Sequence, residues 1–138
     1  MYILDTDHIS LFQRDNPGVV SNVLKKPQSM LATTVITAEE QLRGRLAMIR
    51  KARTDERIVN AYDNLLATVL YFRTITVIGF GSESQTIFRK LREGKIRIGT
   101  QDLRIAAIAI ARDATVVTRN QKDFSLVPSL KTEDWSSA

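Results

Sequence analysis

At four separate places along the chain, acidic residues stand where a predicted strand gives way to a predicted helix. They are Asp5 with Asp7, Glu39 with Glu40, Asp102, and Asp123. In an open α/β sheet such transitions lie along one edge, so acids that are far apart in sequence can meet in a single cleft. Carboxylates gathered in this way repel one another, and a divalent cation is the usual compensation. The pattern therefore predicts hydrolysis that uses a hard metal ion.

Each of these acids also has a purely structural explanation. Asp5 or Asp7 could cap the helix that follows. For Asp7 the two explanations are equal, whereas for Asp5, one position still on the strand, we favour metal ligation. Asp102 suits a helix N-terminus through the macrodipole whatever its role, and Asp123 lies in a stretch of β-turn composition. The joint occurrence of four acidic positions, rather than any one of them, favours a site.

Glu39 and Glu40 are neighbours, so their side chains point about 100° apart around a helix and do not easily face one ion together. Thr37 is expected to cap this helix, with Glu40 three residues on completing a capping box. The apolar spacing of the helix does not decide between the two glutamates. At this point either of them is a candidate ligand.

Strand-like and helix-like segments alternate along the chain, which indicates βα units and a largely parallel sheet. Strands are predicted at 2–4, 30–36, 75–78 and 115–118. Apolar residues at helical spacing predict two helices, one with Leu42, Leu46 and Ile49 in the core, that form a hairpin turning near 54–55. Ser82 is expected to cap a later helix. Five aromatic residues are expected in the core: Tyr2, Phe12, Tyr62, Phe72 and Phe88.

The size and composition of the chain set further limits. At 138 residues it is predicted to be one domain over 1–138. A net charge of +5 and a pI near 9.8 suit a polyanionic partner such as nucleic acid, or only aid solubility. The absence of cysteine excludes disulfides and zinc–thiolate sites. No apolar run is long enough for a membrane span and no secretory signal begins the chain, so we expect a cytoplasmic protein.

The motifs around these acids resemble those of PIN-domain proteins, and within that superfamily of the VapC toxins of bacterial toxin–antitoxin pairs. The matching segments are Leu-Asp-Thr-Asp at 4–7, Thr-Ala-Glu-Glu-Gln-Leu-Arg-Gly at 37–44, Ile-Gly-Thr-Gln-Asp-Leu-Arg-Ile-Ala at 98–106, Val-Val-Thr-Arg-Asn-Gln-Lys-Asp-Phe at 116–124 and a terminal Glu-Asp-Trp. Each is weak alone, but their order and spacing are fairly specific. The resemblance implies a PIN-like α/β fold with a mostly parallel sheet of four to five strands flanked by helices.

The resemblance also implies roles for particular residues. The first family aspartate falls on Asp5 and the third acid on Asp102. The family glutamate falls on Glu40, which breaks the tie with Glu39. The fourth acid varies in the family between two positions, of which the first is Asn120 here, so Asp123 is the remaining candidate. Because Asn120 is neutral, one tightly held ion is favoured over two.

The activity implied is hydrolysis of an RNA phosphodiester bond by a metal-activated water. Mg²⁺ would be held mainly by Asp5 and Asp102, with Glu40 ligating the ion or orienting the water, and Mn²⁺ would suit the same oxygen ligands. Thr118 and Asn120 would hydrogen-bond a scissile phosphate or a ligating carboxylate. The ion would lower the pKa of its water and offset charge on the phosphorane.

Two groups of basic residues are candidates for binding the RNA backbone. Arg43 heads the first, in which arginines recur every seven residues. Arg97 belongs to the second, which leads into Asp102 and comprises Arg89, Lys90, Arg92, Lys95 and Arg97. Contacts of this kind give affinity without sequence choice. For the first group a merely solvated helix face is an equally good explanation.

By the same resemblance the chain is expected to form homodimers and to be inhibited by a VapB-like antitoxin. The segment 65–72 offers apolar surface for either contact. The alternative function is a catalytically inactive PIN-like module that binds RNA or a regulatory partner. RNA cleavage with and without metal distinguishes the two.

Overall fold

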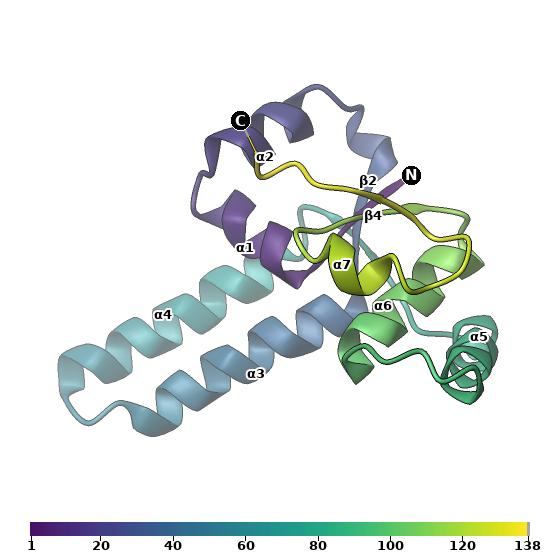
Figure 1. Cartoon of the computed structure of the whole chain (residues 1–138). Helices are drawn as coiled ribbons and strands as arrows, with labels where there is room; N and C mark the ends of the chain where they lie inside the picture. The colour runs from purple at the N-terminus through teal and green to yellow at the C-terminus, as the bar shows by residue number, and fades with distance from the viewer. Residues whose placement is uncertain (138) are drawn as a thin grey trace.

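The computed structural model describes residues 1–137, which build a five-stranded, entirely parallel sheet with helices on both faces (Figure 1). The strands are β1 (Tyr2–Leu4), β2 (Leu31–Thr34), β3 (Thr76–Ile78), β4 (Thr115–Val117) and β5 (Lys131–Glu133). Their order across the sheet is β3-β2-β1-β4-β5. The prediction of a mostly parallel sheet of four to five strands flanked by helices is confirmed.

Seven α-helices and one short 3₁₀ helix connect the strands within the described residues. They are α1 (Thr6–Gln13), α2 (Pro17–Leu24), η1 (Gln28–Met30), α3 (Val35–Lys51), α4 (Asp55–Tyr71), α5 (Ser82–Glu93), α6 (Thr100–Ala111) and α7 (Gln121–Phe124). No helix in this part of the chain is both long and apolar enough to cross a bilayer.

Two hydrophobic clusters hold the layers together, one on each face of the sheet. The larger cluster joins the sheet to α5 and α6 and includes Ile3 and Val116. The smaller one joins it to α1 and α2 and includes Leu4 and Val117. Neighbouring strand residues thus enter opposite clusters, because successive side chains of a strand point to opposite faces. A sheet covered on both faces explains the continuous apolar runs of its strands.

The order of the strands reverses direction once, between β1 and β4. From β1 the chain moves to β2 and β3 on one side, and α5 and α6 then return it to β4 on the other side of β1. The carboxyl ends of β1 and β4 therefore flank the point where the direction of winding reverses. In open α/β sheets this is where a ligand crevice forms.

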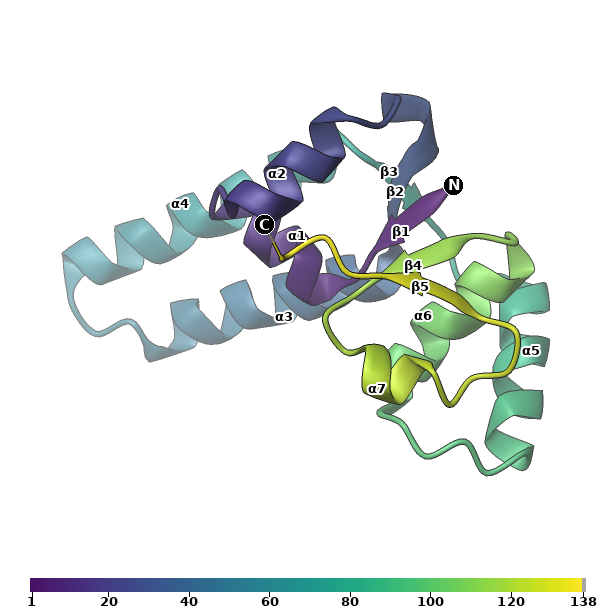
Figure 2. The ribbon, with the colours of Figure 1, turned by 45° about the horizontal axis from the view of Figure 1, so that its top comes forward.

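Helices α3 and α4 form the expected hairpin, which extends away from the sheet (Figures 1 and 2). Thr54 caps α4 by accepting a hydrogen bond from the backbone N–H of Arg57, so the turn lies where the sequence predicted it. Because the hairpin extends away from the sheet, the prediction that Leu46 and Tyr62 lie in the core is wrong. Leu46 is 46% exposed and Tyr62 is 55% exposed.

Two predicted helix caps are also wrong. Helix α3 begins at Val35, and its cap is Thr34, whose side chain accepts from the backbone N–H of Thr37 at 3.3 Å. The strand predicted over 30–36 is accordingly shorter, since the cap is Thr34 and the helix begins three residues earlier than a Thr37 cap allowed. Helix α5 is preceded by Gly81 at the cap, and Ser82 is its first residue.

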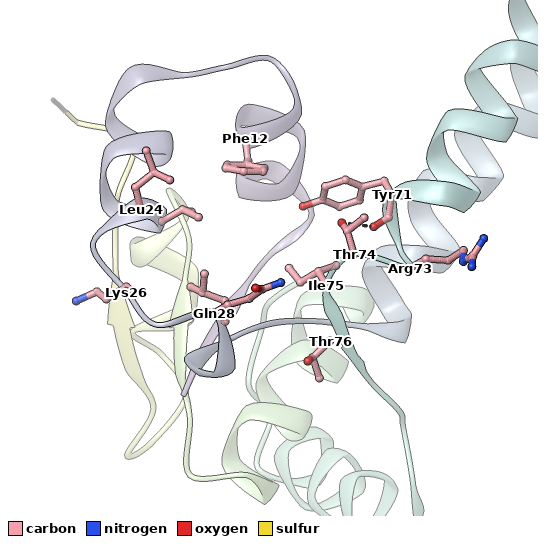
Figure 3. A pocket seen from close by; sticks show the side chains of 11 residues that line it. Phe12, Leu24, Lys26, Gln28, Tyr71, Arg73, Thr74, Ile75 and Thr76 are labelled. Carbon is pink, nitrogen blue, oxygen red and sulfur yellow. Dashed lines mark hydrogen bonds between the residues drawn. The ribbon is translucent and has the colours of Figure 1, made fainter.

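A cavity of about 540 Å³ opens between the ends of α1, α2 and α4 (Figure 3). Phe12, Leu24 and Tyr71 line it together with residues of β2, β3 and the loops beside them. Burial raises the pKa of Tyr71 to about 12, so its phenol keeps its proton at physiological pH. No acidic side chain lines this cavity, which therefore differs in chemistry from the acidic edge of the sheet.

Candidate active site

Three of the four acidic places meet in one open hollow of about 510 Å³ at the carboxyl ends of β1 and β4. Its lining residues are Asp5, Thr6, Asp7, Ser10, Glu40, Asp102, Arg119 and Asn120. They come from the start of α1, the first half of α3, the first turn of α6 and the loop after β4. The topology thus brings together carboxylates that are separated by up to 97 positions, the difference between 5 and 102.

Asp5 both caps α1 and faces the hollow. Its backbone N–H donates to the carbonyl of Val117 at 3.0 Å, which fixes the end of β1 against β4. Its Oδ1 accepts from the backbone N–H of His8 at 2.8 Å, as in an N-cap. Among the described residues no hydrogen bond reaches Oδ2. Capping and ligation are therefore compatible at Asp5, because each uses a different oxygen.

Glu40 is held toward α1 by a threonine that the sequence prediction did not single out. The hydroxyl of Thr6 donates to Glu40 Oε1 at 2.6 Å and lies 3.0 Å from the hydroxyl of Thr37. Glu40 lies beyond the first turn of α3, which begins at Val35, so it is not the glutamate of a capping box. Its position at the hollow supports the choice of Glu40 over Glu39.

Asp102 and Asp123 are connected through Asn120. The side-chain amide of Asn120 lies 3.3 Å from Asp102 Oδ2 and 3.0 Å from Asp123 Oδ2, donating to both. Asp123 lies on α7 and does not line the hollow, so it stands behind Asn120. The neutral amide thus takes a place between two carboxylates, where it lowers their repulsion.

Burial raises the pKa of Asp102 above its usual 3.8. The hydrogen bond from Asn120 lowers it in part, whereas the negative charges of Asp5, Glu40 and Asp123 raise it further. The cluster is therefore electrostatically unfavourable when all its carboxylates are ionised. A bound cation would relieve this repulsion.

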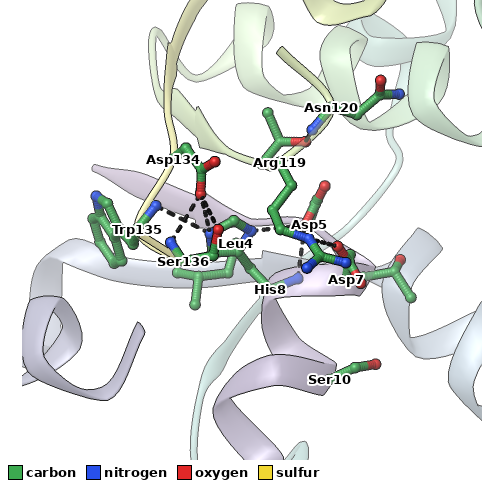
Figure 4. A network of polar contacts seen from close by, with 12 residues as sticks. Leu4, Asp5, Asp7, His8, Ser10, Arg119, Asn120, Asp134, Trp135 and Ser136 are labelled. Carbon is green, nitrogen blue, oxygen red and sulfur yellow. Dashed lines mark hydrogen bonds and ion pairs between the residues drawn. The ribbon is translucent and has the colours of Figure 1, made fainter. Parts of the chain in front are cut away.

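Glu39 and Asp7, the two acids of these places to which the resemblance gives no ligand role, are already engaged by other side chains. Glu39 Oε2 lies 2.6 Å from Arg43, and Gln101 donates to Glu39 Oε1 at 2.8 Å. Asp7 lines the hollow and forms an ion pair of 2.7 Å with Arg119 (Figure 4). Asp7 and Arg119 thus place a salt bridge at the rim, while Glu39 belongs to the outer surface between α3 and α6.

The predicted substrate-binding residues lie in different surroundings. Asn120 lines the hollow, and Arg97 is exposed on the loop that leads into α6. Arg43 is exposed and paired with Glu39. Thr118 is fully buried, and its hydroxyl accepts from the backbone N–H of Asn120 at 2.9 Å. Thr118 therefore shapes the loop that presents Asn120, and its contact with a phosphate stays a prediction.

The donor atoms suit a hard divalent cation, although they do not form a closed cage. Within residues 1–137, no three acidic or histidine side chains converge tightly enough to hold an ion by themselves. Mg²⁺ differs from ions that need such a cage, since it retains several waters and commonly binds one or two carboxylates plus substrate phosphate oxygens. An open hollow with Asp5, Glu40 and Asp102 on its wall fits this mode of binding.

The sequence has extended similarity to known ribonucleases, although no family model matches it. Ribonuclease VapC1 of Haemophilus influenzae strain R2866 is 26% identical over 140 residues, which cover 99% of this chain and 98% of that protein. The tRNA(fMet)-specific endonuclease VapC of Shigella flexneri is 26% identical over 139 residues and 98% of both chains. This chain is similar to VapC ribonucleases along almost its whole length. The resemblance predicted from the motifs is confirmed.

Solved structures of VapC-containing complexes share the fold. VapBC-1 from nontypeable Haemophilus influenzae aligns with a TM-score of 0.78 and 21% identity over 99% of this chain and 98% of that chain. VapBC2 from Rickettsia felis, bound to a DNA fragment from their promoter, aligns with a TM-score of 0.69 and 26% identity over 97% and 98%.

Thr6 and Arg119 are among the residues of the acidic hollow that the sequence analysis missed. Both stand inside quoted motifs, since Thr6 separates the first two aspartates and Arg119 precedes Asn120. Their position in the sequence was the available signal. Each lies two residues beyond the end of a strand that borders the reversal of winding. Their partners, Glu40 and Asp7, lie too far away in sequence for spacing to reveal them.

Proposed function

We propose that this chain is a metal-dependent endoribonuclease and the toxin of a VapBC-type toxin–antitoxin pair. The observation that most strongly supports this is the convergence of Asp5, Glu40 and Asp102 on one hollow at the reversal of winding. The similarity to VapC ribonucleases supports the choice of RNA as substrate.

We assign Asp5 and Asp102 as the main ligands of Mg²⁺, with Mn²⁺ as a substitute. Asp5 has Oδ2 available for this, and Asp102 has a carboxylate whose repulsion by its neighbours a cation would relieve. When bound, the ion would lower the pKa of a coordinated water and stabilise negative charge on the phosphate in the transition state. Glu40, which accepts a hydrogen bond from Thr6, would orient that water.

The second set of residues would position the RNA. Asn120 faces the hollow through its amide, and Arg119 provides a cation at the rim. The exposed basic residues near the end of α5, including Lys95 and Arg97, would attract the phosphate backbone. Because Asn120 replaces an acid and Asp123 is held behind it, we propose one firmly bound ion, with any second ion arriving with the substrate.

The test compares RNA cleavage by three proteins under two conditions. Wild type should cut tRNA in Mg²⁺ and lose this activity in EDTA. Asp5→Ala should lower cleavage by more than about 100-fold, since even loss of a group that only supports a metal ligand costs about 10–100-fold. The matched control is Asp63→Ala, which removes an exposed acid from α4 and should cleave as wild type does.

Three outcomes of that comparison are informative. Undiminished cleavage by Asp5→Ala means that the assigned site is wrong. RNA binding by wild type without any cleavage in Mg²⁺ or Mn²⁺ favours the alternative function, an inactive PIN-like binding module. Cleavage that persists in EDTA contradicts the role of the metal.

We further propose that a VapB-like antitoxin contacts α4 and the cavity at its end. The VapBC structures from H. influenzae and R. felis contain toxin and antitoxin together. In this chain α4 exposes apolar side chains four residues apart, including Tyr62, Leu66 and Leu70, and the next residue, Tyr71, lines the cavity. Exposed apolar surface of this kind marks protein contacts. Homodimerisation stays a prediction, to be checked by light scattering of the free chain.

A further inference from the structure

We propose that His8, braced by the C-terminal segment, is a positioning residue that holds the Asp5 carboxylate in the orientation needed for metal binding. This inference rests on the proposed role of Asp5. His8 is fully buried, although it is the only histidine of the chain and lies three residues from Asp5. A buried imidazole has polar atoms that need partners, so its surroundings indicate what it does.

One ring nitrogen of His8 is engaged by the C-terminal segment. The backbone N–H of Trp135 donates to His8 Nε2 at 3.2 Å, and Asp134 Oδ1 lies 3.5 Å from the same nitrogen (Figure 4). An Nε2 that accepts a hydrogen bond carries no proton, so in the neutral ring the proton is on Nδ1.

The other ring nitrogen faces the site. His8 Nδ1 lies 3.4 Å from Asp5 Oδ1, and among the described residues it has no hydrogen-bond partner. The backbone N–H of His8 already donates to that same oxygen at 2.8 Å. The backbone N–H of His8 thus holds Oδ1, and the ring nitrogen Nδ1 lies beside the same oxygen, which leaves Oδ2 as the oxygen that can turn to the hollow. Outer partners that orient a ligand in this way commonly tune metal affinity.

The C-terminal segment that engages Nε2 is itself firmly packed. Trp135 is 3% exposed, its ring lies 5.3 Å from that of Tyr2, and its indole N–H donates to Glu133 at 2.9 Å. Gly18 allows the close approach of α2, since a Cβ there would lie 2.7 Å from the carbonyl oxygen of Trp135. A chain of contacts therefore runs from α2 through the end of the chain to His8 and Asp5.

The first test needs no mutation, because a single histidine gives a single set of imidazole signals. In ¹⁵N NMR of the full chain, His8 should be the Nδ1–H tautomer, and saturating Mg²⁺ should shift its Nδ1 resonance. An Nε2–H tautomer, or an Nδ1 resonance that does not respond to Mg²⁺, overturns the proposal.

The second test uses two variants that each keep one half of the imidazole. His8→Asn places an amide donor near the position of Nδ1, whereas His8→Gln reaches only the position of Nε2. Mn²⁺ binding, followed by the electron paramagnetic resonance of the free ion, should weaken about tenfold in His8→Gln and stay within about twofold of wild type in His8→Asn. Equal Mn²⁺ affinities in all three proteins would mean that His8 only fills space.

Asp5→Ala separates this inference from the proposed function. Loss of Mn²⁺ binding and of RNA cleavage in Asp5→Ala, together with unchanged Mn²⁺ binding in His8→Gln, overturns only the role of His8. Intact Mn²⁺ binding and cleavage in Asp5→Ala would overturn the proposed site as a whole.

Discussion

At the scale of single residues, the acids of the hollow differ in what holds them. Asp5 is held by the backbone N–H of His8, Glu40 by the hydroxyl of Thr6, and Asp102 by the amide of Asn120. None of these partners is a cation, so the hydrogen bonds orient the carboxylates without neutralising them. The unneutralised charge should reduce the stability of the metal-free protein.

Asp102→Asn should therefore raise the melting temperature in EDTA by a few degrees at neutral pH. Because the folded-state pKa of Asp102 lies above 3.8, the unfolded chain ionises first as pH rises. The free energy of unfolding thus falls between pH 3.8 and the raised pKa and stays lower above it. The advantage of the variant should grow over this interval and vanish in stronger acid.

Thermal unfolding across pH, followed by circular dichroism, checks this expectation. Asp63→Asn on α4 serves as the matched control, because Asp63 is exposed and lies away from the hollow. An Asp102→Asn variant that melts below wild type at neutral pH in EDTA would contradict a repulsive cluster. In saturating Mg²⁺ wild type should instead melt at a higher temperature than Asp102→Asn, because only wild type keeps all the proposed Mg²⁺ ligands.

At the scale of elements, the helices that border the site present acids at their N-terminal ends. Helix α1 presents Asp5 at its cap, and α6 presents Asp102 in its first turn. These helices are aligned by packing on the sheet, and α2 is aligned by its contact with the C-terminal segment at Gly18. The glycines of the chain should accordingly respond differently to the same substitution.

Gly18→Ala should lower the free energy of unfolding by about 1–3 kcal/mol, because its Cβ would meet the backbone of Trp135 and Ser136. Gly44→Ala, in the exposed interior of α3, should raise it by about 0.5–1 kcal/mol, because among the described residues nothing beyond the adjacent residues and backbone of its own helix lies within 4 Å of the added Cβ. Urea unfolding of both variants measures the two effects. An unchanged free energy of unfolding in Gly18→Ala would show that the C-terminal segment can shift away from α2 at no cost.

At the scale of the whole molecule, the acidic hollow, the basic loop before α6 and the apolar face of α4 lie on different elements. A net charge of +5 suits a protein that attracts a polyanion. The local acidic cluster suits a site where a bound cation takes part in cleavage. The protruding hairpin leaves apolar side chains unpacked within the chain itself. Those side chains are where we expect the antitoxin to bind.

Leu66→Asp on α4 and Leu24→Asp at the cavity should each weaken antitoxin binding at least tenfold, because a buried charge replaces an apolar contact. Leu126→Asp is the matched control, since Leu126 is 52% exposed and lies on neither surface. Calorimetric titration with a VapB-like antitoxin that binds the wild-type chain measures the three affinities. Normal binding by Leu66→Asp and Leu24→Asp would place the antitoxin elsewhere.

Local patterns in the sequence were sufficient for the parallel sheet, the helical hairpin and the place of Asp5 at the end of β1, because these depend on near neighbours. The prediction that Asp102 follows a strand was wrong, since Asp102 lies in the first turn of α6 after the loop from α5. The local patterns left the choice between Glu39 and Glu40 to a resemblance, and they misplaced Thr37, Leu46 and Tyr62. Only the tertiary structure decided which groups contact each acid. Thr6 reaches Glu40, and the end of the chain reaches His8, through contacts between segments up to 127 residues apart. Such pairings are set by how helices pack across the sheet, which no local periodicity encodes.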